Sequence, residues 1–102
     1  MKYNARFHFT KNNTTFGKHF DGLIQICEHT MPFGTRTITF WHGLADLTHE
    51  TADLEFFNTM ANDPEAFIFV QLQDGRHGRG VCVAGEVAGN YFSVAIAGCE
   101  SF

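Results

Sequence analysis

The stretch AFIFVQLQDGRHGRGVCVAGEVAGNYFSVAIA, residues 66–97, decides the expected fold of this chain. Runs of apolar and β-branched residues at positions 66–72, 81–87 and 91–97 predict three strands in succession. A Gly-Asn pair between the last two runs has the composition of a two-residue hairpin turn. Three consecutive strands favour an antiparallel or mixed sheet over a doubly wound parallel one.

The residues before this stretch add two strands and two helices to the prediction. Apolar and polar residues alternate over 3–10, and β-branched and aromatic residues dominate 35–42, so both segments predict strands. Apolar residues recur at helical spacing over 16–29 and again over 48–62. The apolar side of the second helix would be formed by Ala52, Phe56, Phe57, Met60 and Ala61. We therefore expect an α+β fold in the order βαβαβββ, with a five-stranded antiparallel or mixed sheet and both helices packed on one face. The run at 66–72 is apolar on both faces at first, which predicts an interior strand covered by helices.

Size and composition predict one small domain. The 102 residues are 44% hydrophobic and 18% charged, which is typical of a globular protein, so we expect a single α+β domain over residues 1–102. No apolar run approaches the roughly 20 residues of a membrane-spanning helix, and no signal peptide precedes the first strand, so we expect a cytoplasmic protein. The 12 phenylalanines indicate either a Phe-rich core or a surplus of rings that serve as interface anchors on the surface.

Charge is distributed unevenly along the chain. The formal net charge is −4 at pH 7, yet residues 1–36 carry five basic and two acidic side chains. Residues 37–75 carry seven acidic side chains and no Lys or Arg, and residues 76–102 are balanced. If the second helix packs its phenylalanines inward, its outer side presents uncompensated carboxylates, which would attract a basic surface. The alternative is a solvated helix face whose early acidic residues interact with the helix dipole.

From this pattern we expect a small protein-binding module or inhibitor that docks an acidic helical surface on a larger basic protein. The predicted partner-binding residues are the carboxylates around the second helix: Asp46, Glu50, Asp53, Glu55, Asp63 and Glu65. A protein that handles nucleic acid offers such a basic surface, and anti-defence (anti-CRISPR-like) proteins of phages and mobile elements form a class of this kind. The net charge of −4 predicts that the chain does not itself bind nucleic acid, because the phosphate backbone requires several Lys or Arg contacts.

A second hypothesis is a small dimeric enzyme or ligand-binding domain. Its pocket would lie near Trp41, His42 and the loop that carries Arg76, His77 and Arg79. The glycines of this loop would let backbone N–H groups approach an anion, and the two arginines supply fork-shaped donors. Phosphate-binding loops lead from a strand into a helix, whereas this loop joins two predicted strands, so a flexible hairpin is the alternative.

Residue spacing supports no metal site, cofactor or catalytic residue, and we expect none; an enzyme stays open without a motif to support it. The six histidines show no HxH, HxxxH or HExxH arrangement. The cysteines Cys27, Cys82 and Cys99 cannot all pair within one chain and form no CxxC motif, so we expect reduced, structural thiols. A third hypothesis is self-assembly through an edge strand and residues 98–102, which would give a homodimer.

Overall fold

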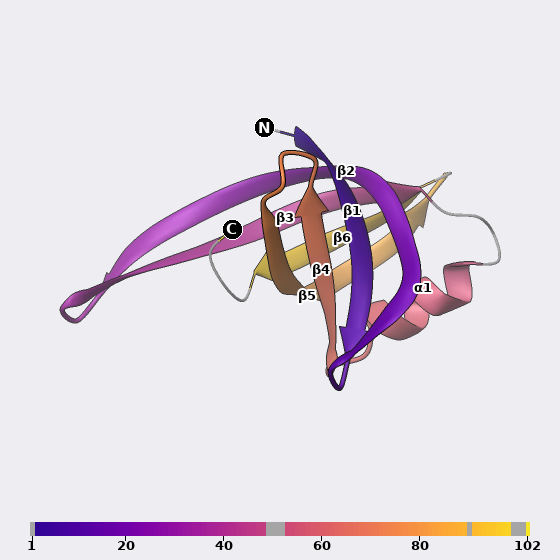
Figure 1. Cartoon of the computed structure of the whole chain (residues 1–102), viewed down its shortest axis with the longest axis horizontal. Coiled ribbons are helices and arrows are strands. Elements are labelled where there is room, and N and C mark those ends of the chain that lie inside the picture. Colours follow the sequence, from indigo (N-terminus) through magenta and orange to yellow (C-terminus); the bar gives the residue numbers. More distant parts are fainter. Residues whose placement is uncertain (1, 49–52, 90, 99–101) are drawn as a thin grey trace.

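Alternation of apolar and polar residues runs through most of the chain and builds strands rather than helices. The computed structural model describes residues 2–48, 53–89, 91–98 and 102, and these residues form a closed antiparallel β-barrel with one short helix (Figure 1). The elements are β1 (Lys2–Lys11), β2 (Thr14–Phe33), β3 (Arg36–Thr48), α1 (Leu54–Ala61), β4 (Ala66–Leu72), β5 (His77–Ala88) and β6 (Tyr91–Gly98). The strand order around the ring is β1-β2-β3-β6-β5-β4, and β4 pairs with β1 to close it. The barrel therefore consists of two three-stranded meanders, and the connection between them carries α1.

The helix predicted over residues 16–29 is wrong, because this segment lies in β2. Its apolar spacing also suits a strand: Phe20 and Ile24 are buried in the barrel, whereas Leu23 and Cys27 are exposed on the opposite face. The two glycines of the segment disfavour a helix. Pairing with β1 on one side and β3 on the other supplies the backbone hydrogen bonds of a ladder, so tertiary pairing overrides the helical period.

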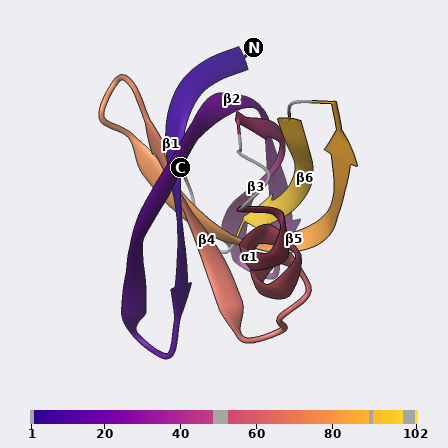
Figure 2. The same ribbon diagram turned by 90° about the vertical axis from the view of Figure 1, so that its right-hand side faces the viewer.

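The second predicted helix exists but is much shorter than residues 48–62. Thr48 is the last residue of β3, and residues 49–52 lie outside the part of the chain that the structure describes. Phe57 and Met60 are buried, as the predicted apolar side requires. Figure 2 shows α1 across the opening at one end of the barrel, not on the face of a sheet. The predicted α+β class, with five strands and two helices on one face, is therefore wrong; the fold is mostly β.

The other strand predictions agree with the structure, but the predicted loop that carries Arg76, His77 and Arg79 is shorter, because β5 begins at His77. Strands form at the predicted positions 3–10, 66–72, 81–87 and 91–97, and most of 35–42 lies in β3. β4 differs in its surroundings, because Phe67 and Phe69 on its outer face are only half-buried. The outer rings pack against Arg79 and His77 of β5, so the predicted covering layer of helices is wrong.

The core is a cluster of aromatic rings between the inner barrel wall and α1. The Phe57 ring is fully buried and lies 4.1 Å from the Phe20 ring and 4.7 Å from the Phe92 ring, measured between centroids. Burying one such ring stabilises a fold by about 1.5–3 kcal/mol. The phenylalanines thus build a core rich in rings, and Phe33 and Phe40 remain exposed on the surface.

One hairpin extends beyond the barrel. β2 pairs with β1 only as far as Gln25, and β3 pairs with β6 only from His42 onward, within the described residues. Residues 26–33 of β2 therefore pair with β3 alone, and residues 36–41 of β3 pair with β2 alone; the hairpin turns at Gly34, whose φ of 64° suits glycine. We call residues 26–41 the arm. It projects from the end of the barrel opposite α1 and accounts for the elongated dimensions of 49 × 30 × 23 Å (Figure 1).

Candidate functional site

The outer face of the arm is apolar and exposed. Cross-strand pairing places Met31 opposite Ile38 and His29 opposite Phe40, so these four side chains share one face. Phe33, next to the turn, is 66% exposed, and Met31, Ile38 and Phe40 are exposed as well. Small soluble proteins seldom leave large apolar side chains gathered in this way unless the surface is covered by a partner.

Both edges of the arm are also open. On each side of the two-stranded ribbon, backbone N–H and C=O groups have no neighbouring strand among the described residues. Such edges are sites where another chain can add or pack. Because an isolated two-stranded ribbon is only marginally stable in water, the arm gains order from whatever covers it.

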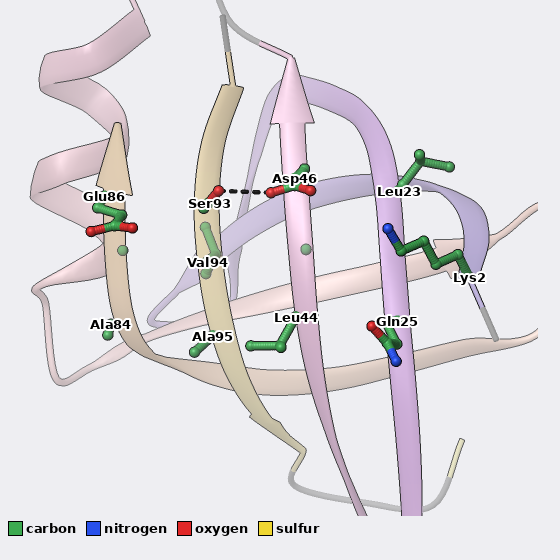
Figure 3. A pocket seen from close by; sticks show the side chains of 12 residues that line it. Lys2, Leu23, Gln25, Leu44, Asp46, Ala84, Glu86, Ser93, Val94 and Ala95 are labelled. Atoms are coloured by element: carbon green, nitrogen blue, oxygen red, sulfur yellow. Dashed lines mark hydrogen bonds between the residues drawn. The ribbon is translucent and has the colours of Figure 1, made fainter. Parts of the chain in front are cut away.

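At the base of the arm, the outer face forms a groove of about 410 Å³ (Figure 3). Its floor is built from small side chains, Ala84 on β5 and Ala95 on β6, beside the larger and 59% exposed Leu44 on β3. Lys2 lies at one margin and Glu86 at the other (Figure 3). An apolar floor with charged margins is typical of a protein-docking surface.

Asp46 lies in this groove. One of its carboxylate oxygens accepts a hydrogen bond from the Ser93 hydroxyl at 2.7 Å, and its side chain remains exposed (Figure 3). Of the predicted partner-binding residues that the structure describes, Asp46 is the one on the apolar outer face.

A stacked histidine pair joins the groove to the arm. The Nε2 of His29 and the Nδ1 of His42 are 2.8 Å apart, and the two rings lie 4.8 Å apart between centroids at an angle of 18°. His29 also stacks on Phe40 at 5.2 Å. Within the described residues, no group of three or more His, Cys, Asp or Glu side chains is arranged to hold a metal ion. The pair therefore extends the aromatic surface of the arm.

The predicted acidic surface around the helix is partly neutralised by lysines of the same chain. Asp53 is buried and hydrogen-bonded to Lys18. Asp63 accepts a hydrogen bond from the Lys11 ammonium at 2.5 Å, which holds the pKa of Asp63 below its ordinary value of 3.8. An ion pair within one molecule largely cancels the electrostatic potential of its carboxylate. These two carboxylates therefore add little attraction for a basic partner.

The remaining carboxylates of that surface are dispersed. Glu55 on α1 and Glu65 before β4 are exposed, while Glu50 lies outside the described residues. The Glu65 backbone N–H donates to Asp63 at 2.9 Å, which ties it to the internal ion pair. The structure thus separates Asp46 from the acidic residues near α1.

The residues of the predicted ligand pocket are not brought together. Trp41 is 1% exposed and packs inside the barrel against Phe102, at 4.7 Å between ring centroids. His42 faces outward on β3. Arg76 is hydrogen-bonded to Asp74 at 2.9 Å and lies over the Tyr3 ring. Trp41 therefore belongs to the core, whereas Arg76 precedes β5 and His77 and Arg79 lie within it, on another face of the barrel.

His77 and Arg79 lie on that other face. The His77 ring stacks on Phe69 at 5.4 Å, and the Arg79 guanidinium lies 4.8 Å from the centroid of the Phe67 ring. These contacts come from β4 and β5, whose outer faces are adjacent.

Sequence reasoning missed the arm, although its signal is present. Residues 27–33 and 38–44 each place an exposed, mostly apolar or histidine side chain at every second position, on either side of a Gly-containing turn. Assigning residues 16–29 to a helix hid the first half of this pattern.

A comparison of the chain with protein-family models, curated proteins and solved structures finds no match. No helix in the described part of the chain is long and apolar enough to cross a membrane.

Proposed function

We propose that this protein is a protein-binding module that docks through the outer face of the arm and the groove at its base. The observation that carries the proposal is the row of exposed apolar side chains on this face, headed by Phe33 and Leu44. Exposed aromatic and aliphatic anchors of this kind supply most of the free energy of protein–protein binding.

The surface matches a second copy of the same chain. Six cross-strand pairs follow one another along the outer face, from the tip to the groove: Phe33/Arg36, Met31/Ile38, His29/Phe40, Cys27/His42, Gln25/Leu44 and Leu23/Asp46. Two copies can pack with these outer faces together, related by a two-fold axis that lies in the interface and crosses the strands between the third and fourth pairs. In this arrangement the first pair of one copy contacts the last pair of the other. Arg36 then meets Asp46, Phe33 meets Leu23, and Ile38 meets Leu44. An isologous interface must be self-complementary in this sense, with charge on opposite charge and apolar on apolar.

The test is the mass of the protein in solution, measured by sedimentation equilibrium over a range of concentrations. We expect a dimer of twice the 11.5 kDa chain mass at micromolar concentration. Reversing one charge, in Arg36→Asp or in Asp46→Arg, should weaken dimerisation about 10-fold, since the like-charge contact occurs twice in a symmetric dimer. The double variant, which restores opposite charges, should recover most of the loss. Glu55→Arg, on α1 and away from the interface, is the control and should leave the dissociation constant unchanged.

The outcomes separate the two parts of the proposal. A wild-type monomer at high concentration excludes the second copy as the occupant. If the monomer instead binds a different, larger protein and Phe33→Asp abolishes this binding, the arm is still the docking surface but its partner is that other protein. A dimer that persists unchanged in Phe33→Asp and Leu44→Asp would exclude the arm as the docking surface.

A further inference from the structure

A second face of the barrel carries four rings in a row, one from each of four neighbouring strands. They are His19 on β2, His8 on β1, Phe69 on β4 and His77 on β5, and we call them the ring track. Successive centroids are 6.0, 6.3 and 5.4 Å apart. The track runs across the strands on the outside of the barrel, because Phe7 and Phe9, which flank His8 in sequence, point into the core.

The rings of the track are at least partly accessible to solvent. His19 and His77 are exposed, and His8 and Phe69 are half-buried. The Nδ1 atom of His8 is buried without a hydrogen-bond partner among the described residues, so a polar contact does not explain its placement there. Burial, followed by the nearby His19 and Arg6, lowers the pKa of His8 below 6.5, which leaves this ring uncharged at neutral pH.

Cationic and hydroxyl side chains lie beside the track. Arg79, the cross-strand neighbour of Phe69, holds its guanidinium over the Phe67 ring at 4.8 Å. Arg6 borders His8 and pairs with Asp21 at 3.1 Å. A pocket of about 440 Å³ adjoins the track, and its lining includes polar side chains beside Phe69 and Gly78: Thr10, Asn13, Thr15, His77 and Arg79.

We infer that this face binds single-stranded nucleic acid, with bases stacked on the ring track and a phosphate held in the polar pocket beside Arg79. Proteins that bind single strands combine aromatic stacking platforms with cations that follow the backbone, and the track presents both. Rings spaced at about 6 Å across a sheet suit successive bases of an extended strand, whereas a duplex keeps the faces of its bases covered.

The local charge differs from the charge of the whole chain. The net −4 arises from seven acidic residues within positions 37–75, and none of these lies in β1, β2, β4 or β5. Asp21, next to the track, is already paired with Arg6. The expectation that the chain does not bind nucleic acid rested on the total charge, which does not describe this face.

Fluorescence anisotropy with a labelled oligothymidylate of about 20 nucleotides, in low salt, tests the inference. We expect saturable binding by the wild type that Phe69→Ala weakens by about 5- to 100-fold, the range for loss of one stacked base. Tyr91→Ala is the matched control, because it removes a half-exposed ring from β6, a strand that supplies no ring to the track, and should change nothing.

A second pair of variants guards against a folding defect in Phe69→Ala. Arg79 and Arg76 are both exposed, so replacing either by alanine leaves the core intact. Arg79→Ala should weaken binding and reduce the slope of log affinity against log salt by about 0.7, the value for one phosphate contact on a single strand, whereas Arg76→Ala should preserve the slope. An oligouridylate of the same length distinguishes RNA from DNA.

Three results would overturn the inference. They are absence of binding to both oligonucleotides at about 100 µM protein in low salt, equal affinity for a duplex of the same length, and unchanged affinity in both Phe69→Ala and Arg79→Ala. The inference does not depend on the arm, since the charge-swap variants of Arg36 and Asp46 test the docking surface separately.

Discussion

Replacing Phe57 by alanine tests whether α1 stabilises the barrel by closing one end of it. The Phe57 ring is fully buried and packs against the rings of Phe9, Phe20 and Phe92, at 6.2, 4.1 and 4.7 Å between centroids. Truncating a Phe in such a site removes the transfer free energy of the ring and leaves a cavity that the rigid barrel wall cannot fill. The expected loss in the free energy of unfolding is about 3–5 kcal/mol.

Urea unfolding, followed by fluorescence of the single Trp41, measures this loss at a fixed protein concentration. With a denaturant slope of about 1–3 kcal/mol per molar urea, the midpoint should fall by roughly 2 M. Glu55→Ala changes an exposed residue of the same helix and should stay within about 0.5 kcal/mol of the wild type. A loss below about 1 kcal/mol for Phe57→Ala would show that the helix does not complete the core.

Three further outcomes are expected. Gly22→Ala should destabilise the protein by about 1–3 kcal/mol in the same urea assay, because its methyl group would lie 2.1 Å from a backbone oxygen of β3. Gly17→Ala is the control, since its methyl group would enter open space and should not destabilise the protein. Equal losses in the two variants would contradict the close contact between Gly22 and β3. The pKa of Asp63 is lowered in the folded protein, so its ionised form stabilises the fold at pH values above its ordinary pKa of 3.8, and this stabilisation is lost as the pH falls. The difference in the free energy of unfolding between wild type and Asp63→Asn should therefore narrow below about pH 4. A difference that stays constant with pH would contradict the ion pair. Burial raises the pKa of the Cys82 thiol to about 11, so iodoacetamide at pH 8 should label the exposed Cys27 first, as peptide mapping would show; faster labelling of Cys82 would exclude its burial.

Local periodicity identified most of the strands, but not how they join. Alternation over residues 3–10 and 91–97 has one interpretation, and both segments are strands. The segment 16–29 fits two periods at once, because Phe16, Phe20, Leu23 and Ile24 satisfy helical spacing while Phe20 and Ile24 also satisfy alternation. Only the partners on either side, β1 and β3, decide between the two, and their positions are not encoded within the segment itself.

The candidate surfaces depend on the same long-range information. Phe33 and Leu44 can be placed on the same exposed face only once β2 and β3 are known to form a hairpin. The ring track is harder still to predict, since His8, Phe69 and His77 come from three strands and meet through the closure of the ring. Charge counting along the chain found an acidic segment, but it could not foresee that Lys11 and Lys18, from the first hairpin, pair with Asp63 and Asp53.

Closure of the ring through β1 and β4 has a consequence for how the protein matures on the ribosome. Phe7 pairs with Val70, so β1 leaves the ribosome long before its partner strand β4, which closes the ring, has been synthesised. Pairings this distant in sequence carry a large loop-closure entropy and fold slowly. Until that step, the free side of β1 and the bare hairpin are open to other nascent chains, and aggregation at this stage is favoured by high rates of synthesis. Slower translation or lower temperature should therefore raise the soluble yield.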